Sequence, residues 1–315
     1  MKVTKLLAIS IRDESFEDFL NIAKRVNRLD SSIGILIRNG SFHPREIPLR
    51  YQNIPLLTLY LVNPPDTPHT RGCSLSVKDL GKLEEYKNFI AAGVPIPKVK
   101  PYTIGETVDA AEWGDYVVLK PVYSSHAIGN LLIPTNWLKQ IERNTIPPTH
   151  PLASNLYLLQ QFVNTGAHAM SYRVLSFLGQ PLMCISWRRA RPIKFPESLD
   201  EIFTNESFTS NFKQEENLFD EREFKIANDE EVVKFSSQVF NANPDLPLQG
   251  IDIVRDAVSG KLFVLENNSG GNVWTFSNQA SPTLKAIGRK ALVTQFMAFD
   301  RAAEILVKKT HELAR

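Results

Sequence analysis

The chain has 315 residues, of which 43% are hydrophobic and 22% charged, and its formal net charge is +2. This length suits one elaborate domain or two to three packed subdomains, and the mild charge gives no argument for a nucleic-acid or membrane partner. The short apolar run before Arg12 is neither a signal peptide nor a membrane span. Two cysteines far apart, Cys73 and Cys184, indicate free thiols in a reducing compartment, so we expect a cytoplasmic protein.

The pattern of apolar residues over the first 76 positions predicts a small α/β unit. Strands are expected at 5–11, 33–38 and 55–62, where apolar residues run together, and a helix is expected at 16–29 from its three-to-four-residue repeat. No catalytic grouping is visible in this unit.

A helix is predicted over 77–92, because Gly93 suits its end and Pro95 prevents its continuation. Its lysines Lys82 and Lys87 would ordinarily be solvated surface residues.

Lys120 ends the apolar strand YVVL, directly before a proline. The loop that follows contains small residues, among them Ser124 and Gly129, whose backbone N–H groups can approach an anion. This pattern favours a phosphate site, and the alternative is a lysine that extends to solvent at a strand end.

A strand near 157–163 leads into a predicted hairpin that turns at 178–180. Arg173 lies in its first strand and Arg189 in an arginine cluster at the end of its second. Arginine suits phosphate or carboxylate binding, although a cluster at a strand edge is as often solvated. Residues 192–228 are polar and are predicted to form an irregular segment outside the core.

The stretch from Gly250 to Asn272 predicts two strands joined by a turn. Asp252 lies inside the first apolar run, Glu266 follows the second, and Asn268 comes two residues later. Residues two apart share a face of a strand, and an antiparallel neighbour can bring the third donor to the same place. Three oxygen donors suit a hard cation such as magnesium, and the alternative is an ordinary hairpin with polar ends.

Taken in order, these segments resemble the ATP-grasp superfamily. Within it, the chain is similar to carboxylate–amine ligases such as D-alanine–D-alanine ligase, glutathione synthetase and the ribosomal-protein glutamate ligases. The resemblance covers about residues 78–275. It is carried by GKLEEYKNFIAAGVPIPK as the entry helix, VVLKP as the second phosphate-lysine segment, LLQQFV as the hinge, WRRA as an arginine-bearing strand end, TSN as a short motif ending at Asn211, and GIDIV with LENN as the metal pair.

The resemblance implies an α/β (α+β) ATP-grasp fold with three units. Residues 1–76 would form the N-terminal α/β domain, 77–156 the small ATP-grasp subdomain, and 157–315 the C-terminal subdomain with the metal site and the C-terminal helix. The two subdomains would enclose the nucleotide.

The resemblance also implies roles for the matched residues. The catalytic residues would be Arg189, Lys120 and Arg173; the nucleotide-binding residues Lys82, Lys120, Ser124, Gly129, Gln160, Gln161, Phe162, Val163 and Ser171; and the metal ligands Asp252, Glu266 and Asn268. Gln161 and Ser171 stand where the family has acids, a departure that bears on nucleotide affinity. Residues 269–272 replace the family's Pro-Gly ending and are expected to face the substrate.

The resemblance implies an ATP-dependent carboxylate–amine ligase that works through an acyl phosphate. Its cofactors would be ATP and Mg²⁺, with Mn²⁺ as the alternative metal. Its partners would be a carboxylate substrate and an amine acceptor, either an amino acid or a peptide. Related ligases are often dimers or tetramers, which makes a homo-oligomer one option, and the sequence itself does not give the oligomeric state. The alternatives are a ligase that modifies peptides or proteins, with 192–228 as a docking surface, a nucleotide-binding relative without turnover, and a kinase-like phosphoryl transferase.

Overall fold

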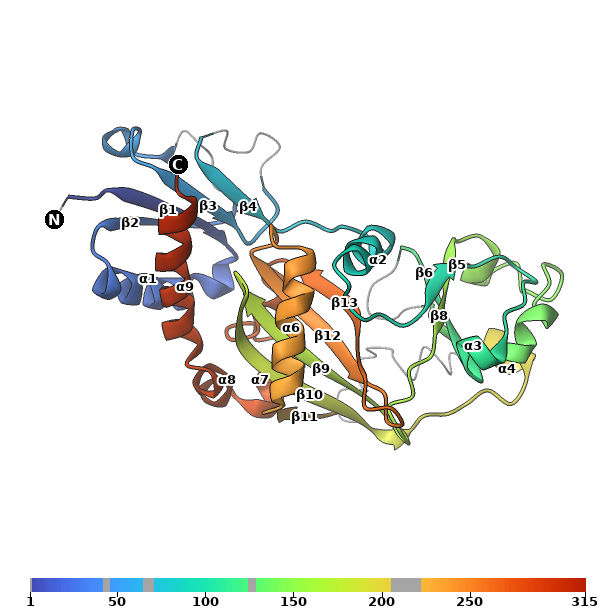
Figure 1. Cartoon of the computed structure of the whole chain (residues 1–315). Helices are drawn as coiled ribbons and strands as arrows, with labels where there is room; N and C mark the ends of the chain where they lie inside the picture. Colours follow the sequence, from blue (N-terminus) through green and yellow to red (C-terminus); the bar gives the residue numbers. More distant parts are fainter. Residues whose placement is uncertain (1, 42–45, 65–70, 124–128, 205–221) are drawn as a thin grey trace.

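The computed structural model describes residues 2–41, 46–64, 71–123, 129–204 and 222–315. These residues form three β-sheets, and Figure 1 shows the third sheet between the other two. None of the described helices is long and apolar enough to cross a membrane.

The first sheet is parallel, with the strand order β2-β1-β3-β4. Its strands are β1 (Lys5–Ile11), β2 (Ile33–Asn39), β3 (Leu56–Tyr60) and β4 (Cys73–Ser76), and α1 (Phe16–Leu29) connects β1 to β2. The first three strands and the helix confirm the sequence prediction. The edge strand β4 was not predicted, because serines alternate with its apolar residues and the run is short.

The predicted C-terminal helical segment is three helices, namely α7 (Pro282–Ile287), α8 (Arg289–Gln295) and α9 (Ala298–Leu313). α9 packs against α1 and also reaches the strands of the first sheet (Figure 1). Arg25 of α1 pairs with Asp300 at 2.7 Å, and the backbone N–H of Leu56 donates to the carbonyl of Arg315 at 2.9 Å. The end of the chain is therefore part of the structure around the first sheet.

The second sheet is antiparallel, with the order β5-β8-β6-β7. Its strands are β5 (Val99–Pro101), β6 (Tyr116–Pro121), β7 (Leu131–Pro134) and β8 (Tyr157–Gln161), with α3 (Ala110–Trp113) between β5 and β6. The sheet thus continues to residue 161, beyond the predicted boundary at 156, and the three domain boundaries stay predictions.

The helix before this sheet, α2 (Lys82–Ala91), begins five residues later than predicted. Gly81 adopts a φ of +68°, a left-handed conformation that glycine tolerates, and its N–H donates to the Asp79 side chain at 2.8 Å. Lys82 is consequently the first residue of the helix. Residues Thr135–Gln140 form a short 3-10 turn, and the Thr135 hydroxyl donates to the carbonyl of Gly114.

The third sheet is antiparallel, with the order β11-β10-β9-β12-β13. Its strands are β9 (His168–Phe177), β10 (Gln180–Pro192), β11 (Arg222–Ile226), β12 (Leu248–Arg255) and β13 (Leu262–Ser269). α6 (Glu230–Ala242) covers one face, as Figure 1 shows, and buries Val232 and Val239 against Val174 and Ile251. Arg173 and Asp252 alternate with these apolar residues and therefore belong to the opposite face.

The prediction of an irregular polar excursion at 192–228 is wrong for the parts that the structure describes. Ile202, in α4 (Leu199–Thr204), is buried in the core of the second sheet. The ring of Phe195 lies 4.4 Å from that of Tyr116, and Arg222–Ile226 pairs with β10 as an edge strand. The apolar residues of this segment are too widely spaced to give a periodic signal. Residues 205–221 lie outside the described part of the chain.

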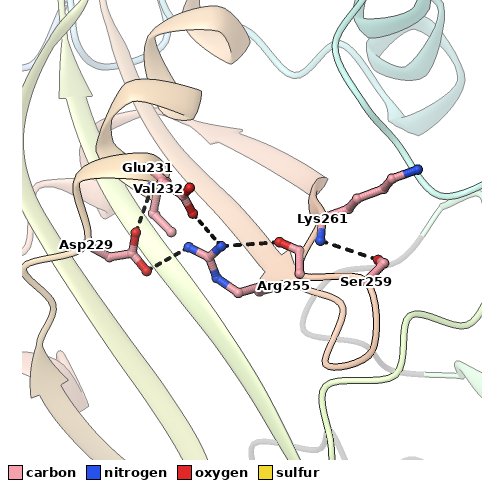
Figure 2. A network of polar contacts seen from close by, with 7 residues as sticks. Asp229, Glu231, Val232, Arg255, Ser259 and Lys261 are labelled. Atoms are coloured by element: carbon pink, nitrogen blue, oxygen red, sulfur yellow. Dashed lines mark hydrogen bonds and ion pairs between the residues drawn. The ribbon is translucent and has the colours of Figure 1, made fainter.

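A polar network fastens the β12–β13 turn to the start of α6 (Figure 2). Asp229 caps the helix by accepting the N–H of Val232 at 3.1 Å. Arg255 pairs with Asp229 at 2.8 Å and with Glu231 at 2.6 Å, and it donates to the carbonyl of Gly260 at 3.2 Å. The hairpin that carries the predicted metal ligands is therefore held from the α6 side of the sheet.

Replacing Asp18 should weaken the fold strongly. Asp18 is 1% exposed, accepts the indole N–H of Trp274 at 2.9 Å and pairs with Arg289, so it joins α1 to the segment after β13. Asp18→Ala leaves the buried indole N–H of Trp274 without its acceptor and Arg289 without its ion-pair partner, and we expect the free energy of unfolding in urea to fall by roughly 3 kcal/mol. The exposed neighbour Glu17 offers a matched control, since Glu17→Ala should change the free energy of unfolding by less than about 0.5 kcal/mol. Equal effects of the two substitutions would contradict this role of Asp18.

Candidate active site

The three predicted metal ligands lie together at one edge of the third sheet. β12 and β13 pair with Asp252 opposite Glu266 and Gly250 opposite Asn268, which confirms the predicted hairpin. The Asn268 side-chain nitrogen lies 3.2 Å from Asp252 Oδ2 and 3.1 Å from Glu266 Oε1. Two carboxylates and an amide therefore share one small space.

Gly250 allows the chain to pack closely beside this group. A Cβ at Gly250 would lie 2.8 Å from Cγ1 of Val273, in the turn η7 (Gly271–Val273) that follows β13. A larger residue would push this turn away from the Asn268 edge.

Arg173 binds Asp252 from the neighbouring strand. β9 places Arg173 opposite Asp252, and its guanidinium donates from Nε to Oδ1 at 2.7 Å and from Nη2 to Oδ2 at 2.6 Å. Burial raises the pKa of Asp252 to about 6, although the charge of Arg173 opposes that rise. Burial would also raise the pKa of Glu266, but the Asn268 hydrogen bond and the charges of Lys120 and Arg173 leave that pKa below its usual value.

Two lysines approach these carboxylates from the other side. Lys82, at the start of α2, donates from Nζ to the carbonyl of Pro121 at 2.9 Å. Lys120 lies next to that proline on β6, where burial lowers its pKa to about 8 against the attraction of Glu266. Burial also lowers the pKa of Lys82, again opposed first by Glu266. The charges of the second and third sheets therefore meet at Glu266.

Glu85 and Tyr86 are members of this site that the sequence analysis missed. Glu85 is 9% exposed and accepts the backbone N–H of Asn267, between two of the predicted ligands. Burial raises the pKa of Glu85 to about 8, and the charge of Glu266 adds to the rise. Tyr86 donates to the carbonyl of Leu265 at 3.1 Å. The available signal was helical spacing, since Lys82, Glu85, Tyr86 and Phe89 share one face of α2.

The predicted nucleotide residues of the hinge lie where β8 ends. The Gln160 side chain is 2% exposed and donates to the Tyr86 hydroxyl at 2.9 Å, so it serves packing between α2 and β8. Gln161, Phe162 and Val163 follow and are partly buried.

The remaining predicted residues lie in three places. Ser171 is 5% exposed and lies opposite Trp187. Gly129 has a φ of +77°, and a Cβ there would lie 3.0 Å from Pro121 Cγ, so both conformation and space require glycine. Ser124 and Asn211 lie outside the described residues.

Arg189 lies on the Arg173 face of the third sheet but further along it. Arg173 pairs with Ile185 of β10, and Arg189 follows four residues later, about 13 Å along the strand. Arg189 is 8% exposed and lies opposite Arg222 of β11. The structure thus brings Lys82, Lys120, Arg173, Asp252, Glu266 and Asn268 together and places Arg189 beyond them.

The donor set fits a hard cation. Among the described residues, no group of three or more His, Cys, Asp or Glu side chains is placed to hold a metal ion, and the set here is two carboxylates and one amide. Oxygen donors of this kind suit Mg²⁺. The Asn268 side-chain N–H donates to both carboxylates, so ligation requires the amide to turn over and present its oxygen.

An open hollow of about 540 Å³ lies on the other face of the sheet. Tyr172, Asp229 and Arg255 are among its lining residues, and they belong to the α6 side. Arg255 is paired with Asp229 and Glu231. Because the candidate site lies on the opposite face, with Arg173 and Asp252, this hollow is separate from it.

Comparison with known proteins gives a match by structure alone. No protein-family model and no curated protein matches the chain by sequence. The macrocyclase MdnC from Microcystis aeruginosa MRC, bound with the precursor peptide MdnA, is similar at a TM-score of 0.50 with 11% identity, over 96% of this chain and 99% of that one. The ATP-grasp ligase PsnB, complexed with a variant of its minimal precursor, Mg and ADP, is similar at 0.50 with 13% identity, over 98% and 97%.

The chain has the ATP-grasp fold. D-Alanine–D-alanine ligase from Bacillus anthracis is also similar over 97% of this chain and 99% of that one, at 14% identity and a TM-score of 0.45. The predicted fold is confirmed, while the roles of the individual ATP-grasp site residues stay predictions.

The pH dependence of stability should reveal the buried carboxyl of Glu85. Unfolded glutamate loses its proton near pH 4.5, whereas folded Glu85 keeps it until about pH 8. The folded state therefore binds more protons in this window, and its stability falls as pH rises. In buffer without metal or nucleotide, the free energy of unfolding of the wild type should fall relative to Glu85→Gln between pH 5 and pH 8. The control is Glu84→Gln, at the exposed neighbour Glu84. Its free energy of unfolding should change with pH in the same way as that of the wild type. If the free energy of unfolding of Glu85→Gln changes with pH in the same way as that of the wild type, Glu85 is not a buried acid.

Proposed function

We propose that this protein is an ATP-dependent carboxylate–amine ligase that forms an amide bond through an acyl phosphate. One observation carries the proposal: two lysines of the α2 and β6 segments meet two carboxylates and an amide of the third sheet, with Glu266 acting on both lysines. Such alternation of cations and oxygen donors suits a triphosphate held jointly with a divalent metal.

The lysines supply fixed positive charge for phosphate oxygens. Lys82 and Lys120 are partly withdrawn from water, and the desolvation that lowers their pKa values also strengthens their attraction for an anion. A bound phosphate would raise both pKa values and keep the lysines charged. Asp252, Glu266 and Asn268 would hold Mg²⁺, which would supply positive charge to offset that of the phosphate oxygens.

The reaction transfers the γ-phosphoryl group and then displaces it. A carboxylate oxygen of the substrate attacks the γ-phosphorus, the bond from that phosphorus to the bridging oxygen breaks, and ADP leaves. An amine nitrogen then attacks the acyl carbon, loses a proton, and phosphate leaves. The chain needs no nucleophilic side chain for these steps, because its part is to place charge where oxygens crowd together.

Arg173 would act at the transferred phosphoryl group. Asp252 holds its guanidinium by two hydrogen bonds, which fixes the plane and direction of the remaining donors. A preset cation of this kind stabilises growing negative charge without reorganising during the reaction.

A ligase that acts on a peptide is the second candidate. MdnC was solved with its precursor peptide and PsnB with its minimal precursor, so an assay should offer short peptides as well as amino acids. A nucleotide-binding protein without turnover would bind ATP and release no ADP under either condition.

The proposed function is tested by ADP release over pairs of amino acids and short acidic peptides with Mg²⁺ and ATP. Glu266→Gln keeps the size of the side chain and removes its charge, so we expect the rate to fall by about 100-fold or more. Lys87→Ala, on the exposed side of α2, should retain the wild-type rate. Wild-type turnover by Glu266→Gln would show that the site is misassigned.

A further inference from the structure

β2 is a long apolar strand at the edge of the first sheet. Its seven residues, Ile33–Asn39, carry no charge before Arg38, and β1 pairs with one side of it. Within the described residues no strand pairs with its other side, and Figure 1 shows β2 at the margin of this sheet farther from the third sheet. In one row across the sheet, Leu7 of β1 and Leu57 of β3 are 0% exposed, whereas Ile35 of β2 is only partly buried.

The backbone of β2 presents every second residue to the unpaired side. The carbonyl of Ser32 accepts the N–H of Lys5, and the N–H of Gly40 donates to a carbonyl at the end of β1. Even-numbered residues therefore turn their backbone groups toward β1. Because this direction alternates along a strand, the N–H and C=O groups of Ile35 and Ile37 point outward. Unpaired groups of this kind are a template for another strand.

The other sheet edges are short, charged or covered. β4, β5 and β7 have four, three and four residues. β11 carries Arg222, Glu223 and Lys225. The outer edge of β13 meets the α2 segment, where Glu85 accepts the N–H of Asn267. Features of these kinds prevent strands from associating, so β2 is, among the described strands, the edge that is open to pairing.

The sequence of β2 is complementary to a second copy of itself. In an antiparallel pair with a two-fold axis at Leu36, Ile35 lies opposite the partner's Ile37, and each such pair exchanges two N–H···O bonds through the outward backbone groups. Arg38 then lies opposite the partner's Gly34, which leaves room for the longer side chain. Apolar residues thus meet apolar residues, and no like charges face each other across the pair.

We propose that two copies of this chain associate through antiparallel pairing of their β2 strands. The two first sheets then form one continuous sheet, and the half-exposed isoleucines of β2 become covered. Because both copies use the same edge, the association closes at a dimer. The inference is independent of the proposed ligase function, since the candidate site lies on the third sheet of each chain.

Sedimentation velocity over a range of protein concentrations tests the dimer. Wild type should sediment as a species of twice the chain mass of 35.6 kDa. Ile37→Pro removes an outward N–H and keeps the hydrogen bonds to β1, because proline is tolerated on an edge strand where the N–H faces solvent. This variant should sediment as a monomer and keep the circular dichroism spectrum of wild type.

Disulfide cross-linking gives a second measurement that does not depend on the proline variant. The residues at the axis form a non-hydrogen-bonded pair, with Cα atoms about 4.5 Å apart, which a disulfide can span. Leu36→Cys should therefore form a disulfide-linked dimer under mild oxidation. The matched control is Val258→Cys, at a residue that is 86% exposed in the β12–β13 turn. Wild type, with free Cys73 and Cys184, gives the background.

Three outcomes would overturn the inference. The first is a wild type that sediments as a monomer at every concentration. The second is a folded Ile37→Pro variant that remains a dimer. The third is cross-linking of Leu36→Cys that does not exceed that of Val258→Cys, and this result decides the question if Ile37→Pro fails to fold.

Discussion

The structure depends on the charge of Asp252. This carboxylate is 7% exposed on a strand with apolar neighbours on both sides, and a buried charge must be compensated. The register of β12 supplies the compensation by setting Arg173 of β9 on one side and Glu266 of β13 on the other. The negative charge of Glu266 in turn favours the charged forms of Lys82 and Lys120, which approach from the opposite side of the site. One row of charged residues across three strands therefore forms the candidate site for an anion and a cation.

The contacts around this row connect the α2 segment, which precedes the second sheet, to the third sheet. α2 carries Lys82 and, on the same face, Glu85 and Tyr86, which hydrogen-bond to the backbone of β13. The N–H of Val264 also donates to the carbonyl of Pro95 at 3.1 Å. Because these bonds run from the α2 segment to the strand with the predicted metal ligands, they fix the position of Lys82 relative to the carboxylates.

Local signals predicted much of this site. The hairpin with Asp252 and Glu266 follows from two apolar runs and the turn residues between them, and Lys120 from its place at the end of an apolar strand. Glu85 was missed because its burial results from packing against a strand far along the chain. Such residues become visible only when the register between strands is known.

Calorimetric titration with a non-hydrolysable ATP analogue tests the central claim most directly. If one site joins the lysines to the metal ligands, wild type binds the analogue with Mg²⁺ present and loses at least about tenfold in affinity when the metal is chelated. Lys120→Ala should lose at least about tenfold with the metal present, as expected for one charged contact. Binding that ignores both the metal and Lys120 would show that the row of charged residues on the third sheet is not a nucleotide site.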